Sequence, residues 1–176
     1  MALTENVILG SGVLYISTYT DAIPADEAFE VDANKLGDIK GGCSIAYKPK
    51  SYEVKNDAGQ IVSRYILERE ITMKSGVLKW SVDTLKKLMG EGTLSDDTVE
   101  HIKTLTIGSG IQGLTAYAIR FVHTDASGKK LRVTICGTNE AGISLAFQPD
   151  KETVVDAEFK ALPMPDGNML IISQEY

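Results

Sequence analysis

The sequence is poor in the residues that most often carry metal or thiol chemistry. Its 176 residues include only two cysteines and two histidines. Cys43 and Cys136 lie far apart in strand-like surroundings, so we expect free thiols in a reducing compartment rather than a disulfide framework. A zinc site from His123, both cysteines and a carboxylate would lack the close ligand spacing of zinc motifs. We therefore expect neither a metal site nor a cofactor.

Long apolar runs and an excess of positive charge are also missing. No run approaches the roughly 20 apolar residues of a membrane helix, so we expect no membrane span. The first basic residue is Lys35, which argues against a secretory signal and for a protein assembled in the cytosol. A net charge of −6 excludes general affinity for polyphosphate, because nucleic-acid binders carry basic patches. An acidic surface still suits a wall along which DNA passes without binding.

No motif in the chain predicts catalysis. Residues 108–113 (GSGIQG) match the dinucleotide-binding pattern G-x-G-x-x-G. A strand pattern follows them instead of the required helix, so we interpret them as a flexible strand connection. Glu68 and Glu70 lie two residues apart on one predicted strand, where a solvated polar row is a better interpretation than an acid–base pair. We expect a protein that is not an enzyme.

The largest feature that is present is a long β-hairpin over about residues 43–74. Its turn, residues 56–59 (NDAG), consists largely of residue types that tolerate positive φ. Polar and apolar residues alternate along the return arm, which is typical of a strand buried on one side. The alternation predicts a single apolar face made of Ile61, Tyr65, Leu67, Ile71 and Met73. Arms of this length extend beyond the core of a small domain, so we expect the hairpin to contact a neighbouring subunit.

After the hairpin, Ser81 as N-cap and Gly90 as C-terminal stop delimit a helix over residues 81–89. We interpret residues 91–100 as a polar loop. The acidic connection over residues 19–39 is expected to become ordered on a partner. Strand patterns occupy residues 7–9, 12–18, 101–107, 114–123, 130–136, 143–147, 152–162 and 169–173.

These elements predict a mainly β protein, an antiparallel β-sandwich or partly open barrel with one flanking α-helix. Residues 7–176 are expected to form one domain, preceded by an arm over residues 1–6. Such a fold must protect its sheet edges, and pairing them with other copies is one way to do so.

Several segments together resemble the tail tube proteins of long-tailed bacteriophages. They cover most of the chain from about residue 9 onward, and they are patterns of a structural fold rather than of catalysis. The resemblance lies in residues 41–49 (GGCSIAYKP), 74–80 (KSGVLKW), 119–123 (IRFVH), 131–138 (LRVTICGT), 147–153 (FQPDKET) and 156–163 (DAEFKALP).

The resemblance implies a structural subunit of the virion tail, assembled in the cytoplasm of the bacterial host. Subunits would form hexameric rings that stack into a hollow tube, through which DNA passes into the host without specific binding. Other copies of the chain, the tape measure protein and the initiator and terminator complexes would be its partners. Contacts with the neighbouring ring would involve the hairpin, with the candidates Tyr47, Lys48, Pro49, Tyr52, Asn56, Asp57 and Gly59.

One sheet of each subunit would line the lumen of such a tube. The candidate lumen-facing acidic residues are Glu68, Glu70, Asp156 and Glu158. Like charge on the wall and on the phosphates would keep the DNA from being trapped.

Two alternatives stay open. The first is the inner tube of a contractile tail, a phage-derived bacteriocin or a type VI-like needle, which a sheath would surround. The second, from another class, is a monomeric β-barrel that binds a small ligand. That alternative predicts a closed apolar cavity and no self-association.

Overall fold

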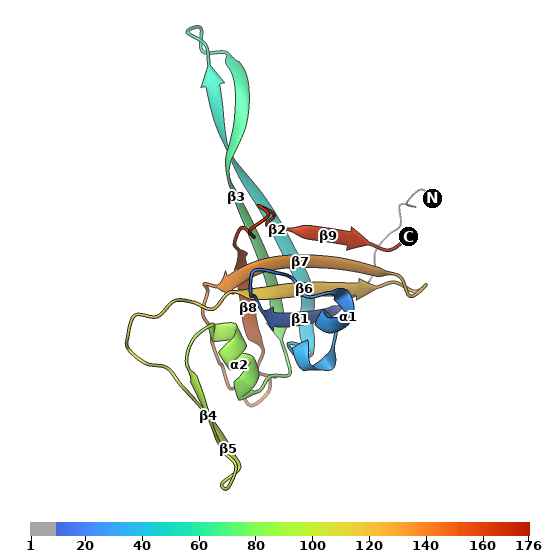
Figure 1. The fold of residues 1–176 in the computed structure, drawn as a ribbon, viewed down its shortest axis with the longest axis vertical. Helices are drawn as coiled ribbons and strands as arrows, with labels where there is room; N and C mark the ends of the chain where they lie inside the picture. The colour runs from blue at the N-terminus through green and yellow to red at the C-terminus, as the bar shows by residue number, and fades with distance from the viewer. Residues whose placement is uncertain (1–9) are drawn as a thin grey trace.

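The computed structural model describes residues 10–176, and within them a seven-stranded antiparallel sheet forms most of the protein (Figure 1). The sheet is open rather than closed into a barrel, which confirms the predicted mainly β fold. The predicted arm over residues 1–6 and the strand over residues 7–9 lie outside the described residues. The strands of this sheet are β1 (Val13–Thr18), β2 (Ile39–Lys55), β3 (Ile61–Val77), β6 (Tyr117–Thr124), β7 (Lys130–Asn139), β8 (Val155–Ala161) and β9 (Ile171–Gln174).

The strand order is β1-β6-β7-β8-β3-β2, and β9 also pairs with β7. One edge of β7 pairs with β6, and its other edge is divided between β9, at Leu131–Thr134, and β8, at Gly137–Asn139. In Figure 1, β1, β6 and β7 run across the direction of β2, β3 and β8. The single sheet therefore folds over itself, and its two parts enclose the core between them.

The core confirms the alternation predicted for the strand near the C-terminus. Val155, Ala157, Phe159 and Ala161 of β8 are buried, while the residues between them are more exposed. They belong to one apolar cluster that also takes side chains from β1, β3, β6 and β7. Burial of this shared cluster holds the two parts of the sheet together.

Helix α2 (Val82–Met89) packs on this core with the predicted boundaries. The Ser81 side chain accepts a hydrogen bond from the backbone N–H of Thr84 at 3.3 Å, which caps the N-terminus. Gly90 has a φ of 70°, and its N–H donates to the carbonyl oxygen of Lys86 at 3.0 Å. Leu85 on the inner side of the helix is buried together with Leu88. The helix thus closes one end of the core.

The acidic connection over residues 19–39 packs on the outer face of β1 and β6. It contains the short helix α1 (Asp26–Phe29) and a 3₁₀ turn at Asp32–Asn34. The Phe29 side chain is fully buried in a second apolar cluster with Tyr15, Ala118 and Val122. The expectation that this segment needs a partner to become ordered is therefore wrong. Its own sheet supplies the surface on which it folds.

Two further expectations are corrected. Residues 91–100 are not simply a loop, because β4 (Thr93–Asp97) pairs with β5 (Ile102–Thr106) in a separate two-stranded sheet. The polar sequence of β4 carries little alternation, and its strand conformation comes from the register with β5. Residues 143–147 form no strand, although Ile143 packs against the core. As predicted, residues 108–113 have no regular structure and a strand follows them. No helix within residues 10–176 is long and apolar enough to cross a membrane.

Candidate assembly surface on the long hairpin

The hairpin of β2 and β3 has arms of 17 residues each and extends far beyond the core (Figure 1). Strand β8 pairs with β3 only between Thr72 and Val77. Residues 61–71 of β3 pair with β2 alone among the described strands. We call residues 47–71 the distal ribbon. Within residues 10–176 its two edges are unpaired, and both of its faces are open except at the base, where Ile71 is buried.

The tip of the distal ribbon is well formed in the isolated chain. The Asn56 side-chain oxygen accepts hydrogen bonds from the backbone N–H groups of Ala58 and Gln60, at 3.1 and 2.9 Å. Gly59 has a φ of 78°, as the turn chemistry of the sequence predicts. Asn56, Asp57 and Gly59 therefore lie at the far end of the hairpin, where a neighbouring molecule can reach them.

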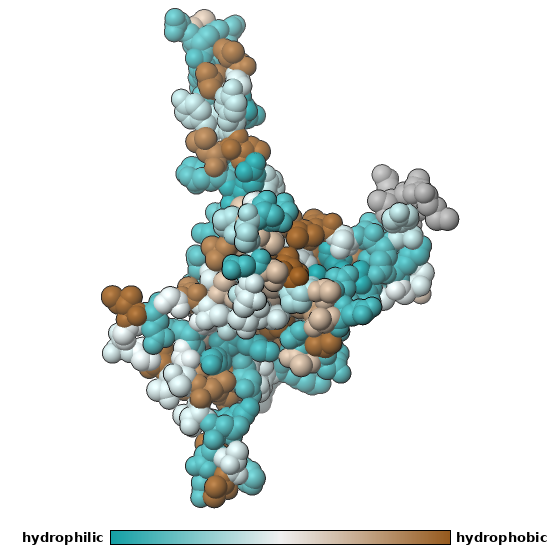
Figure 2. Space-filling view, in the orientation of Figure 1, coloured by the Kyte–Doolittle hydropathy of each residue, from teal (hydrophilic) through white to brown (hydrophobic). Residues whose placement is uncertain are grey.

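Large apolar side chains of the distal ribbon are exposed to solvent. Figure 2 shows brown, hydrophobic residues along the projecting ribbon, interleaved with polar ones. Tyr52 and Tyr65 are 56% and 58% exposed, and Leu67 is 64% exposed. The other exposed apolar residues here are Tyr47, Val54, Ile61, Val62 and Ile66. A group of large exposed apolar side chains on one projecting element is typical of an interaction site, whereas single exposed apolar residues are normal on a protein surface.

The apolar residues do not share one face as the sequence pattern predicts. The register pairs Lys50 with Glu68 but Ser51 with Ile66, so Leu67 is an extra residue on β3. Such a bulge moves the following residues to the opposite face. Tyr65 therefore lies opposite Tyr52, on the face that carries Lys50 and Glu68.

A second register shift, nearer the tip, returns the residues beyond it to the faces that an uninterrupted alternation would give them. The register pairs Val54 with Ser63 but Lys55 with Ile61, which leaves Val62 as the extra residue. The ribbon thus has two apolar faces. The tyrosine face carries Tyr52, Val54 and Tyr65, and the isoleucine face carries Tyr47, Ile61 and Ile66.

The four candidate lumen-facing acids lie on one face of β3 and β8, continuous with the tyrosine face. Glu68 and Glu70 occupy alternate positions of β3, and further along the same face Lys74 lies opposite Glu158. Asp156 lies opposite Gly76, and this pair belongs to the same face of the sheet. The structure therefore brings together residues from two segments that are far apart in the sequence.

Lysines balance these acids, a feature that the sequence analysis missed. The Lys50 Nζ lies 3.1 Å from Glu68 Oε2, and the Lys74 Nζ lies 2.6 Å from Glu158 Oε2. Lys48 lies directly opposite Glu70 in the register. The signal was available in principle, because a hairpin centred on residues 56–59 places basic residues of one arm opposite acidic residues of the other.

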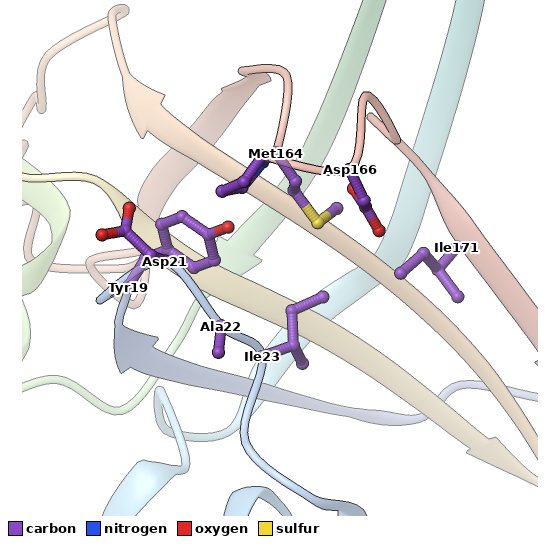
Figure 3. Close-up of a pocket in the computed structure, with 8 residues that line it drawn as sticks. Tyr19, Asp21, Ala22, Ile23, Met164, Asp166 and Ile171 are labelled. Atoms are coloured by element: carbon purple, nitrogen blue, oxygen red, sulfur yellow. The ribbon is translucent and has the colours of Figure 1, made fainter.

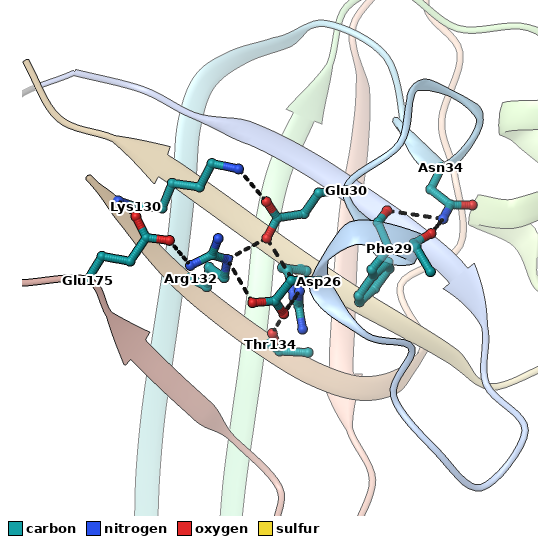
Figure 4. A network of polar contacts seen from close by, with 10 residues as sticks. Asp26, Phe29, Glu30, Asn34, Lys130, Arg132, Thr134 and Glu175 are labelled. Atoms are coloured by element: carbon teal, nitrogen blue, oxygen red, sulfur yellow. Dashed lines mark hydrogen bonds and ion pairs between the residues drawn. The ribbon is translucent and has the colours of Figure 1, made fainter. Parts of the chain in front are cut away.

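A separate charge cluster fastens α1 to the sheet (Figure 4). Glu30 accepts hydrogen bonds from Arg132 Nε at 2.5 Å and from Lys130 Nζ at 2.7 Å. Arg120 Nη1 donates to Asp26 at 2.6 Å, and Arg132 Nη1 donates to Glu175 at 2.6 Å. The cluster joins three acidic and three basic side chains. It links the acidic connection, β6, β7 and the C-terminal segment.

The charges of this cluster shift the pKa of Glu30 and of Arg132. Burial by itself raises the pKa of Glu30, but hydrogen bonds and charge from Arg132 and Lys130 outweigh burial and lower the pKa below its ordinary value. The hydrogen bond to Glu30 in turn raises the pKa of Arg132. The cluster therefore stabilises the fold while the Glu30 carboxyl is ionised.

A shallow depression lies between the start of the acidic connection and the turn before β9 (Figure 3). Its volume is about 280 Å³, and Tyr19, Asp21, Ile23, Met164 and Asp166 contribute to its lining. Partial burial raises the pKa of the Tyr19 hydroxyl, and nearby negative groups add to the effect. The lining contains no His, Cys, Ser, Lys or Arg, so it offers neither a nucleophile–base pair nor a cation for an anionic ligand.

The cysteines and histidines do not form a site in the structure. Burial raises the pKa of Cys43 and of Cys136 to about 11, and both thiols are free. The Nδ1 of His123 lies 2.8 Å from the carbonyl oxygen of Ser11, so the ring N–H donates to the backbone. In the part of the chain that the structure describes, no three His, Cys, Asp or Glu side chains are grouped to hold a metal ion.

No protein-family model matches this chain, and no curated protein sequence matches it. The distal ribbon and its surfaces are therefore the features of this protein that bear on its function.

Proposed function

We propose that this protein is a structural subunit that assembles into hexameric rings, which stack into the hollow tail tube of a long-tailed bacteriophage. The tube is the conduit through which DNA passes into the host. The observation that carries the proposal is the distal ribbon, with its open edges and its exposed apolar side chains.

Two physical properties of the distal ribbon favour contact with another molecule. A two-stranded hairpin without a covering layer is marginally stable in water. Open strand edges also offer unpaired N–H and C=O groups to another chain. Contact with other copies satisfies both requirements at once, because it buries the apolar residues and protects the edges. The resemblance to tail tube proteins supports the same conclusion and supplies the ring and tube geometry.

The net charge and the paired charges of the candidate luminal face are compatible with a channel through which DNA passes. The net charge of −6 repels phosphate at long range. On the candidate luminal face, Glu68 and Glu158 each have a lysine partner, so the face offers DNA few free cations. We infer that DNA slides past paired charges rather than past an acidic wall alone.

The two alternatives receive different support. An inner tube enclosed by a sheath uses the same assembly, and it differs only in what covers the outer wall. A monomeric ligand-binding barrel predicts a closed cavity, and the open seven-stranded sheet does not favour it.

The test is negative-stain electron microscopy of the concentrated purified protein, with size-exclusion light scattering on the same sample. We expect hollow tubes or six-fold rings whose abundance rises with concentration. A double variant, Tyr52→Ser with Tyr65→Ser, is expected to shift the protein to monomers. The matched control is Val31→Ser, which removes an exposed apolar side chain outside the hairpin. A wild-type protein that stays monomeric at every concentration would contradict self-assembly.

A further inference from the structure

The distal ribbon is apolar on both of its faces. Tyr52 pairs directly with Tyr65 on the tyrosine face, and both are more than half exposed. Ile66 and Ile61 lie on the isoleucine face, opposite Ser51 and Lys55, and they are 45% and 50% exposed. Both faces therefore carry large apolar side chains that contact with another molecule would remove from water.

The bulges produce this arrangement. With an uninterrupted register, Tyr65 would share a face with Ile61 and Ile71, and one docking surface would cover all three. The extra residue Leu67 turns Tyr65 away, and the extra residue Val62 returns Ile61. Bulges are specific features of a fold that re-aim side chains. Here they distribute the apolar residues over two sides.

One flat partner surface cannot cover both sides of the ribbon. Side chains on the two faces of a β-layer point in opposite directions, and packed β-layers lie about 10 Å apart. A partner surface that packs on the tyrosine face leaves the isoleucine face exposed to water. A surface that packs on the isoleucine face likewise leaves the tyrosine face exposed. Complete burial needs a second surface.

The protein itself carries a matching surface at its other end. Figure 1 shows the distal ribbon and the β4–β5 hairpin at opposite ends of the long axis. The part of the chain that includes β4, β5 and the loop after them exposes Val99, Ile102, Ile111 and Leu114. Contact between two different patches of the same chain is heterologous, and it repeats from copy to copy.

The charges of the two ends also match. The distal ribbon, residues 47–71, has five basic and four acidic residues. Residues 91–106 have one basic and four acidic residues. A slightly basic end therefore meets an acidic one, which favours other copies of this chain as the occupant.

We propose that the outer part of the distal ribbon, residues 51–66 beyond the Lys50–Glu68 pair, inserts between two neighbouring copies of this chain. There the tyrosine face packs against one copy and the isoleucine face against the other, while the charged pairs nearer the core stay on the candidate luminal face. The inference rests on the proposed self-assembly and makes it more specific. Each ribbon then ties three chains together, which explains why both faces carry large apolar side chains.

The test is photo-crosslinking with benzoylphenylalanine in place of Tyr52, in place of Ile66, or at both positions of one chain. Each probe-bearing chain is assembled with a large excess of wild-type chain, so that a probe meets only wild-type neighbours. We expect dimers from each single-probe chain and covalent trimers from the double-probe chain. Illumination at a concentration where the protein is monomeric is the control for random collisions.

A second measurement uses serine variants of each face. Tyr52→Ser with Tyr65→Ser removes one face, and Ile61→Ser with Ile66→Ser removes the other. Each pair is expected to raise the concentration needed for assembly by roughly tenfold or more, which corresponds to about 1.4 kcal/mol of lost contact energy.

The outcomes separate the two proposals. Dimers without trimers from the double-probe chain would show that one copy covers both faces, and would overturn this inference while leaving tube assembly intact. A single probe that fails to crosslink within tubes, or a serine pair that leaves assembly unchanged, would overturn it in the same way. Absence of any wild-type assembly would instead remove the proposed function, and this inference with it.

Discussion

The guanidinium carbon of Arg120 lies 4.6 Å from the centre of the Phe29 ring. Arg120 belongs to β6 and is buried, and its charge is compensated by Asp26 and Glu30 of the α1 segment. A cation stacked on an aromatic face and paired with carboxylates is a favourable buried arrangement. This contact explains how an acidic segment with few apolar residues folds against its own sheet.

We expect Phe29→Ala to lower the free energy of unfolding by about 3–5 kcal/mol, because it empties a fully buried site under Arg120. Urea denaturation followed by circular dichroism measures this change. Val31→Ala, at an exposed position of the same segment, is the matched control and should change stability by less than about 0.5 kcal/mol. A loss below about 1 kcal/mol for Phe29→Ala would show that α1 contributes little to the fold.

Stability should fall in acid because of Glu30. The folded protein holds the pKa of this carboxyl below its ordinary value of 4.5, through Arg132 and Lys130. A lowered pKa means that the folded state favours the ionised form. The stabilisation is therefore fully present above pH 4.5 and is lost as the pH falls through the folded pKa. Urea denaturation over a series of pH values measures this dependence.

The matched variants for this pH effect are Glu30→Gln and Asp32→Asn. Glu30→Gln leaves Arg132 without its main partner, so it should cost about 3 kcal/mol at neutral pH and flatten the acid dependence. Asp32 pairs with Lys35 at an exposed site, where an ion pair contributes about 0–1 kcal/mol. An unchanged acid slope in Glu30→Gln would assign the pH effect to other carboxylates.

Gly137→Ala tests the point where the sheet folds over itself. A Cβ at this position would lie 2.2 Å from the carbonyl oxygen of Lys160, so β7 and β8 would have to separate. We expect a loss of about 1–3 kcal/mol in the free energy of unfolding, as for other overpacked sites. Gly108→Ala is the control, because nothing lies within 4 Å of its added Cβ. Equal melting temperatures for the two variants would contradict the close approach.

The luminal assignment can be tested at Asp156. In a Cys43→Ser/Cys136→Ala background, Asp156→Cys supplies a single thiol on the candidate luminal face. Assembled tubes should react with a small maleimide but not with a maleimide attached to a large polymer. The free subunit, which should react with both, is the control. Equal labelling of tubes by the large reagent would place this face on the outside.

Local patterns predicted a large part of the fold. The alternation over residues 155–161 and the caps Ser81 and Gly90 depend on near neighbours in the chain, and the structure confirms them. The strand at 93–97 was missed and the strand at 143–147 was wrongly expected. In both cases the deciding factor is a cross-strand partner, which a short sequence window does not contain.

Periodicity and local backbone preferences were enough to predict the hairpin, its turn at residues 56–59, the helix and the mainly β class. Which side chains share a face of the ribbon depends instead on how its two strands pair in three dimensions. Two extra residues, Val62 and Leu67, shift the register there, and a bulge is a property of two paired strands rather than of one. The folding of the acidic segment was likewise decided in three dimensions. Arg120 and Arg132 come from strands about 100 residues away in sequence, and they neutralise its carboxylates only once the sheet has formed.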